Sequence, residues 1–103
     1  MIHLEESGIG SVPMQEVENQ FQKLIKTLQI DHQDLIVDCS ICQPNFPLLK
    51  VIKSHQESVN RCLVVLLPAD QQTDQSAEWN FVPTKIEALD FISFEQMQRD
   101  LGF

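Results

Sequence analysis

The chain lacks the features that mark membrane-spanning or secreted proteins. Among its 103 residues the longest aliphatic run is Leu63–Leu67, far shorter than the roughly 20 residues that a membrane-spanning helix needs. The opening residues, MIHLEESG, contain acids and no basic stretch, so we expect no signal peptide. The odd cysteine count, three, favours reduced thiols over a disulfide framework. These absences predict a cytoplasmic protein.

Basic residues are also scarce. Seven lysines and arginines stand against 15 aspartates and glutamates, which gives a formal charge of -8. The lysines are scattered along the chain, whereas a phosphate backbone or an anionic lipid surface is normally bound by several clustered cations. We therefore expect no nucleic acid and no membrane as partner. Another protein is the partner class that this composition leaves open.

The length and composition predict one α/β domain that covers residues 1–103. Hydrophobic residues make up 43% of the chain, which is typical of a globular domain, and we find no repeat, linker or low-complexity segment. Residues 1–4 predict a short strand, and 5–11 predict a turn-rich connection. Ser11 suits a helix cap and Pro13 a first turn, so we expect a helix from 14 to about 30. One face of that helix is apolar: Val17, Phe21, Leu24 and Leu28.

Two continuous apolar strands joined through a helix predict parallel pairing. The first begins at Leu35 and should run to Ile41 or Cys42, where the prolines of QPNFP stop it. A helix over about 48–60 should follow, and Leu63–Leu67 is the second strand. The inner face of the helix is predicted to hold Leu48, Ile52, His55 and Val59.

The carboxyl-terminal part predicts a loop over 69–78, a short strand over 79–82 and one or two helices. Thr84 and Glu87 form a capping box. Ser93 and Gln96 offer a second capping box, so residues 94–103 either continue the same helix or form a short helical tail of their own. The inner face of the first of these helices is expected to hold Ile86, Leu89 and Ile92. The predicted fold is a mixed or parallel sheet of about four strands with three to four helices.

A Cys-x-x-C pattern, Cys39 to Cys42, offers an alternative function. Thioredoxin-like thiol oxidoreductases carry such a pair at the start of a helix, which lowers the pKa of the first thiol. Here Pro44 and Pro47 follow too closely for a helix to begin at the pair. We therefore expect two small hydrophobic side chains in or beside the sheet, and keep the oxidoreductase as an alternative.

Other catalytic or metal-binding patterns are weak. The cysteines could be combined with His3, His32 or His55, but no second Cys-x-x-C and no H-x-x-x-H is present. No P-loop and no legible Ser–His–acid arrangement occurs either. We expect no metal, no cofactor and no catalytic residue, and so no enzyme.

From about residue 14 to 94 the chain resembles the STAS family, the anti-sigma-factor antagonist domains of bacteria. The segment MQEVENQFQKLIKTLQ is similar to the family's first helix, and LIVDCS to its central strand. LLKVIKSHQESVNRCLVVLLP and FVPTKIEALDFI resemble the elements that follow. The resemblance implies a non-catalytic regulatory module whose partner is an anti-sigma-factor-like or signalling protein.

The chain departs from this family at the regulatory loop. Regulatory STAS proteins carry a Ser or Thr there, and its phosphorylation disrupts the protein complex. Here the loop is QPNFP, without Ser, Thr or Gly, so no phospho-acceptor can be assigned. Ser40 lies earlier, in the expected strand, and should be structural.

The expected function is therefore protein binding through this loop and the start of the following helix. Asn45, Phe46 and Lys50 are the candidate contact residues. Phe46 can be an exposed apolar contact or can pack over the end of the sheet. A further alternative is a structural homodimer, paired through an edge strand or through the tail residues Phe94, Met97, Leu101 and Phe103.

Overall fold

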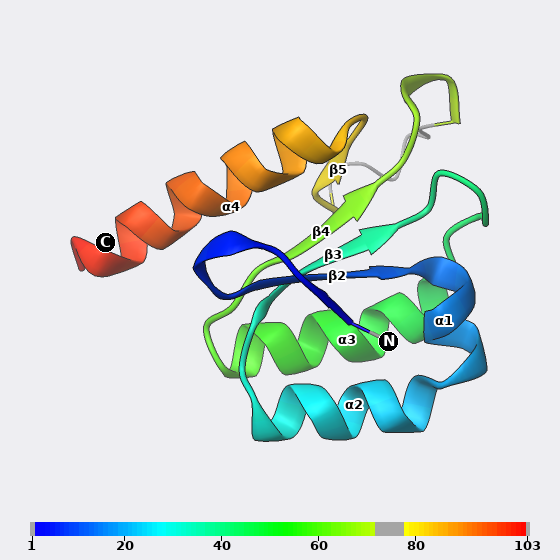
Figure 1. Ribbon diagram of the computed structural model, residues 1–103, viewed down its shortest axis with the longest axis horizontal. Coiled ribbons are helices and arrows are strands. Elements are labelled where there is room, and N and C mark those ends of the chain that lie inside the picture. The colour runs from blue at the N-terminus through cyan, green and yellow to red at the C-terminus, as the bar shows by residue number, and fades with distance from the viewer. Residues whose placement is uncertain (1, 72–77, 103) are drawn as a thin grey trace.

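A mixed sheet of five strands lies at the centre of the chain in a computed structural model that describes residues 2–71 and 78–102 (Figure 1). The strands are β1 (His3–Leu4), β2 (Ile9–Pro13), β3 (Asp34–Asp38), β4 (Leu63–Leu66) and β5 (Phe81–Val82). They lie in sequence order, with β1 antiparallel to β2 and the other neighbours parallel. The α/β class is confirmed, with one strand more than expected.

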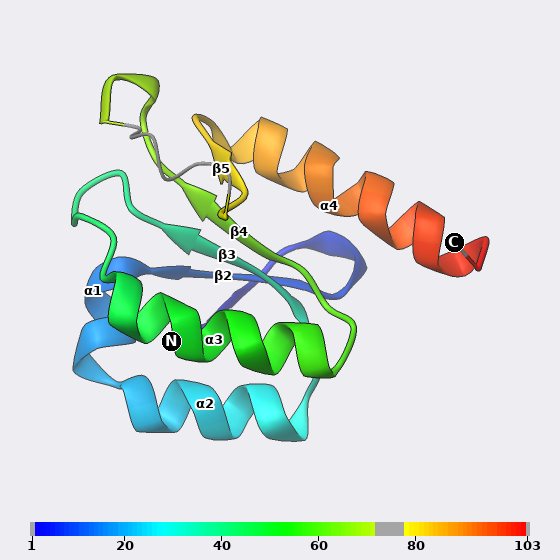
Figure 2. The ribbon, with the colours of Figure 1, turned by 180° about the vertical axis from the view of Figure 1, so that it is seen from behind.

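Helices cover both faces of the sheet. Three lie on one face: α1 (Met14–Asn19), α2 (Phe21–Ile30) and α3 (Phe46–Ser58). The fourth, α4 (Lys85–Asp100), lies alone on the other face, as the views from the two sides agree (Figures 1 and 2). Single turns of 3-10 helix span Glu6–Gly8 and Ala69–Gln71.

The continuous apolar character of β3 and β4 follows from this two-sided cover. Leu35 and Val37 face the three-helix side, whereas Ile36 between them faces α4. The three-helix side holds the larger core. The smaller core consists of Ile9, Ile36, Val64, Leu66, Ala88 and Ile92.

The turn-rich connection predicted over 5–11 is correct for Glu6–Gly8, which form a 3-10 turn, but wrong from Ile9 onward, because Ile9–Pro13 form β2 and Ser11 is not a helix cap. β2 pairs with both β1 and β3, and Ser11 lies in its middle. Gly10 belongs in this strand because of close packing: a Cβ atom there would lie 2.6 Å from Cγ2 of Ile2 and nearer still to the side-chain oxygen of Gln33. A glycine that signals a turn in the sequence thus lies in a strand, where neighbouring side chains pack closely against its backbone.

The helical segments before β3 and after it differ from their predicted form. The helix expected over 14–30 is broken at Gln20, whose φ and ψ of -132° and 40° lie outside the helical region. The inner face of α3 consists of Leu49, Ile52 and Gln56, so Ile52 is buried as predicted, whereas Leu49 and Gln56 take the places expected for Leu48 and His55. The amide of Gln56 can be buried because its nitrogen donates to the carbonyl oxygens of Gln33 and Cys62.

The carboxyl-terminal helix is continuous, and Thr84 is its N-cap as predicted, because the Thr84 hydroxyl accepts a hydrogen bond from the backbone N–H of Glu87. Its inner face holds Ala88 and Ile92, whereas Ile86, expected to be inside, is 73% exposed. Part of the predicted loop over 69–78, residues 72–77, lies outside the described residues, and so does Phe103.

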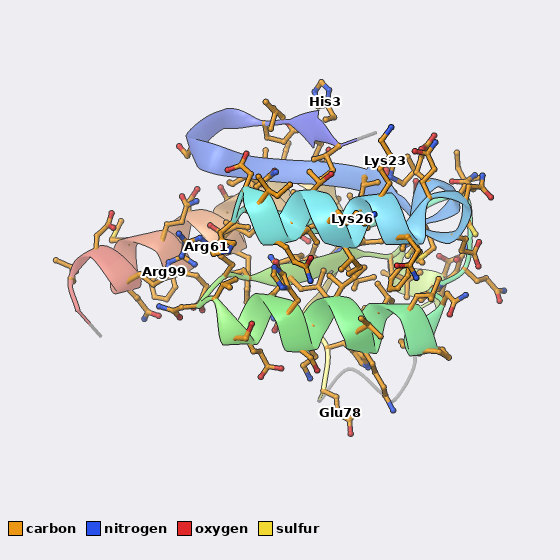
Figure 3. The ribbon with its side chains drawn as sticks, turned by 90° about the horizontal axis from the view of Figure 1, so that it is seen from below. His3, Lys23, Lys26, Arg61, Glu78 and Arg99 are labelled. Atoms are coloured by element: carbon orange, nitrogen blue, oxygen red, sulfur yellow. The ribbon has the colours of Figure 1, made fainter. Side chains whose placement is uncertain are left out.

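A buried ion pair fastens α4 to the sheet. Both carboxylate oxygens of Asp34, at the start of β3, accept from the Arg99 guanidinium at 2.9 and 2.7 Å. Asp34 also accepts from the side chain of Gln96 and from the backbone N–H of Cys62. Figure 3 shows Arg99 near the end of α4, beside Arg61. The side chain of Asp34 is only 3% exposed and that of Arg99 20% exposed, so the carboxylate that holds this helix end is buried.

Replacing Arg99 by methionine should lower the free energy of unfolding by about 3 kcal/mol, because it leaves the buried Asp34 carboxylate without its cation. Arg61→Met is the matched control. Arg61 donates only to the carbonyl oxygens of Val59 and Asn60 in the contacts described, so its loss should cost about 0.5–1 kcal/mol. Urea unfolding at neutral pH measures both values, and equal losses in the two variants would contradict the assigned role.

The same ion pair predicts an acid-dependent stability. Burial opposes the charged form, but the hydrogen bonds from Arg99, Cys62 and Gln96 outweigh it and lower the pKa of Asp34. Its contribution is complete above the unfolded aspartate pKa of about 3.9 and is lost as the pH falls through the lower folded value. The stability difference between the native chain and Asp34→Asn should therefore shrink below about pH 4. A difference that stays constant from pH 7 to pH 3 would refute this.

Candidate functional site

The candidate site is the connection between β3 and α3, at the edge where the parallel strands present their carboxyl ends. Backbone pairing continues one residue beyond β3, since the Cys39 N–H donates to the Leu66 carbonyl at 2.8 Å. The chain then turns, and Asp38 Oδ1 accepts from the Ser40 N–H at 2.9 Å. The strand was predicted to run to Ile41 or Cys42, but it ends before these residues. Ser40, predicted to lie inside the strand, is exposed in the loop.

Asn45 fixes the end of this loop. It is the N-cap of α3, where its Oδ1 accepts from the Leu48 N–H at 3.3 Å. Its Nδ2 donates to Oε2 of Glu18, on α1, at 3.0 Å. The other oxygen of Glu18 accepts from the Cys42 thiol at 3.4 Å. One carboxylate thus ties two points of the loop to a neighbouring helix.

Phe46 packs over the end of the sheet and keeps part of its ring exposed. Its ring centre lies 5.5 Å from that of Trp79 and 6.4 Å from that of Phe81, distances typical of favourable aromatic pairs. The Lys53 ammonium lies 5.1 Å from the Trp79 ring. Beside Phe46 the surface is hollowed. The hollow, of about 290 Å³, is lined by Gln43, Pro44, Phe46, Leu67 and Gln71.

The loop also carries an apolar side chain that the sequence analysis missed. Ile41 is 86% exposed, and Lys50 is exposed on the second turn of α3. We call Ile41, Asn45, Phe46 and Lys50 the loop surface. Ile41 was missed because the segment was read as strand, in which an isoleucine needs no further explanation. The prolines after it were the available signal that the chain turns there.

The three thiols are free and poorly suited to nucleophilic chemistry. Burial, with the nearby Cys42 thiol and the Asp38 carboxylate, raises the pKa of Cys39 to about 12. Burial and the adjacent Asp34 carboxylate raise that of Cys62 to about 12. Desolvation and the hydrogen bond to Glu18 raise the pKa of Cys42. A reactive cysteine needs the opposite shift, toward the thiolate.

We expect the folded protein to show slow thiol chemistry. At pH 7.5, roughly one unit below the ordinary cysteine pKa, iodoacetamide should leave Cys39 and Cys62 unmodified and should alkylate Cys42 more slowly than a cysteine peptide. All three should react in denaturant. Mass spectrometry of timed samples measures this. Fast alkylation of native Cys39, or a Cys39–Cys42 disulfide under mild oxidant, would favour the oxidoreductase alternative.

Within residues 2–71 and 78–102, no group of three or more His, Cys, Asp or Glu side chains is placed to hold a metal ion. His55 contacts the Leu28 carbonyl oxygen through Nε2 at 3.1 Å and lies edge-on to His32, with ring centres 6.0 Å apart. Across the same described residues no helix combines the length and apolar character needed to cross a bilayer.

Comparison with known proteins adds no relative. The chain matches no protein-family model, and searches of curated proteins and of solved structures give no match. The geometry of the loop surface is therefore the basis on which a function can be argued.

Proposed function

We propose that the chain is a non-catalytic protein-binding module of the STAS type, which contacts its partner through the loop surface. The STAS assignment is part of the proposal. It rests on the sequence resemblance over residues 14–94 and on the order of elements: a hairpin, then parallel strands connected through helices. The partner class that it implies is an anti-sigma-factor-like or signalling protein.

The observation that carries the proposal is an exposed apolar side chain on a loop that is held in place. Ile41 is 86% exposed, while the hydrogen bonds of Glu18 to Cys42 and Asn45 restrain the chain after it. A restrained loop loses little conformational entropy when a partner binds. The exposed Lys50 adds a cation nearby on an otherwise acidic chain, which can steer an acidic group of the partner.

The composition of the loop supports binding that is not switched by phosphorylation within it. Residues 43–47 contain no hydroxyl group, so no phospho-acceptor is proposed there. The raised thiol pKa values support an interaction role over thiol oxidoreduction, because a thiolate nucleophile would have to form against burial and neighbouring carboxylates.

Ile41→Asp should weaken binding to the partner by at least about tenfold, because it places a charge where an apolar contact is buried in the complex. Lys50→Glu should weaken it less and mainly by slowing association. The partner is first captured from the native host and purified, and calorimetry or surface plasmon resonance then measures the affinity of each variant.

Ile30→Asp is the matched control, since Ile30 has the same 86% exposure but lies at the end of α2, where β3 begins. It should bind like the native chain. Equal affinity of the Ile41 and Ile30 variants would contradict the loop surface as the binding site. If reduction or thiol blocking abolished binding while Ile41→Asp did not, the cysteines and not the loop surface would be responsible for it.

A further inference from the structure

Helix α4 presents an apolar stripe away from the sheet. With 3.6 residues per turn, positions 86, 90, 94, 97 and 101 share one side of the helix, opposite the buried Ala88 and Ile92. Four of them are large apolar residues with high exposure: Ile86 (73%), Phe94 (58%), Met97 (59%) and Leu101 (66%). We call these four the α4 stripe. Single exposed apolar residues are ordinary, but an aligned row is typical of an interaction surface.

The charges on this side of α4 are acidic. Asp90 lies between Ile86 and Phe94 on the same side of the helix, and Glu87 and Asp100 flank the α4 stripe; all three carboxylates are exposed. The two cations of α4 are engaged with the sheet side instead. Lys85 pairs with Glu5 at 2.6 Å, and Arg99 pairs with Asp34 at 2.7 Å. The outward side of the helix therefore combines an apolar row with carboxylates that no cation of the same helix neutralises.

We propose that the outward side of α4 docks a basic amphipathic helix of another protein. Such a helix supplies apolar residues at matching spacing for the α4 stripe and Lys or Arg side chains for Asp90 and its neighbours. A second copy of this chain fits poorly. It would bring its own Glu87, Asp90 and Asp100 to the interface, with no further α4 cation to meet them, and each chain already carries a charge of -8.

This surface is distinct from the loop surface. It lies on the sheet face opposite α1, α2 and α3, as Figures 1 and 2 show. The proposal does not depend on the function assigned to the loop. Together the two surfaces would let the domain hold two partners at once, one at the carboxyl-terminal edge of the sheet and one on the outward side of α4.

The test uses the full chain and two synthetic helical peptides as long as α4, each with the same leucine stripe. One carries lysines on its flanks and the other glutamates. Fluorescence anisotropy of the labelled peptides should show binding of the lysine peptide, weakened as salt rises from about 0.05 M to about 0.5 M, and no binding of the glutamate peptide. Amide shifts in NMR spectra should concentrate on α4.

Phe94→Asp and Ile86→Asp should each lower the affinity of the chain for the lysine peptide by at least about tenfold. Both substitutions make the chain more acidic, so purely electrostatic adsorption would strengthen. Ile86→Asp also preserves the fold, because an acid near a helix amino end is favourable. Ile30→Asp makes the same charge change on α2 and should leave the affinity unchanged.

Three outcomes would overturn the proposal. Equal peptide affinity in the Ile30, Ile86 and Phe94 variants would indicate general adsorption to an acidic surface. A dimer in light scattering that Phe94→Asp dissociates would identify a second copy as the occupant. Phe94-dependent binding to vesicles of phosphatidylcholine and phosphatidylglycerol would identify a membrane instead.

Discussion

The carboxylate of Asp34 is the point at which α4 is tied to the sheet. It stands at the start of β3 and accepts hydrogen bonds from the backbone N–H of Cys62, just before β4, and from two side chains of α4. Gln96 and Arg99 extend the network to the carbonyl oxygens of Ser7 and Asn60. A buried carboxylate must be paired and hydrogen-bonded to remain charged. The arrangement of α4 over the sheet satisfies that requirement and cannot change without breaking it.

This constraint explains why α4 can carry an exposed apolar stripe. From α4 the small core beneath the helix contains the buried Ala88 and Ile92, and Leu89 and Phe91 are only partly buried against it, so apolar burial holds this long helix through few fully buried side chains. The ion pairs with Asp34 and Glu5 add attachment near both of its ends. They also turn the two cations of the helix inward and leave its outward side acidic. The anchoring of the helix and the character of its free surface thus have one cause.

Strong local patterns in the sequence predicted much of the fold. The apolar runs of β3 and β4, the Thr84 cap and the helix over the middle of the chain were found because burial and capping leave direct marks on neighbouring residues. β2 was missed because Gly10 suggested a turn. In the structure Gly10 lies in the strand, close to the side chain of Gln33, which comes much later in the sequence. The inner face of α3 was misplaced because Gln56 is buried by hydrogen bonds to carbonyl groups on other segments, and polarity in the sequence argues against burial.

The candidate sites show the same division. The sequence by itself determined the α/β class, the acidic charge and the absence of hydroxyl groups in residues 43–47, because these depend on composition and local order. Only the tertiary structure decided that Ile41 is exposed and that Phe46 packs on Trp79. It also decided that the α4 stripe faces outward, since apolar periodicity marks an amphipathic helix without stating which side meets the sheet. That choice was made by Arg99 and its distant partner Asp34.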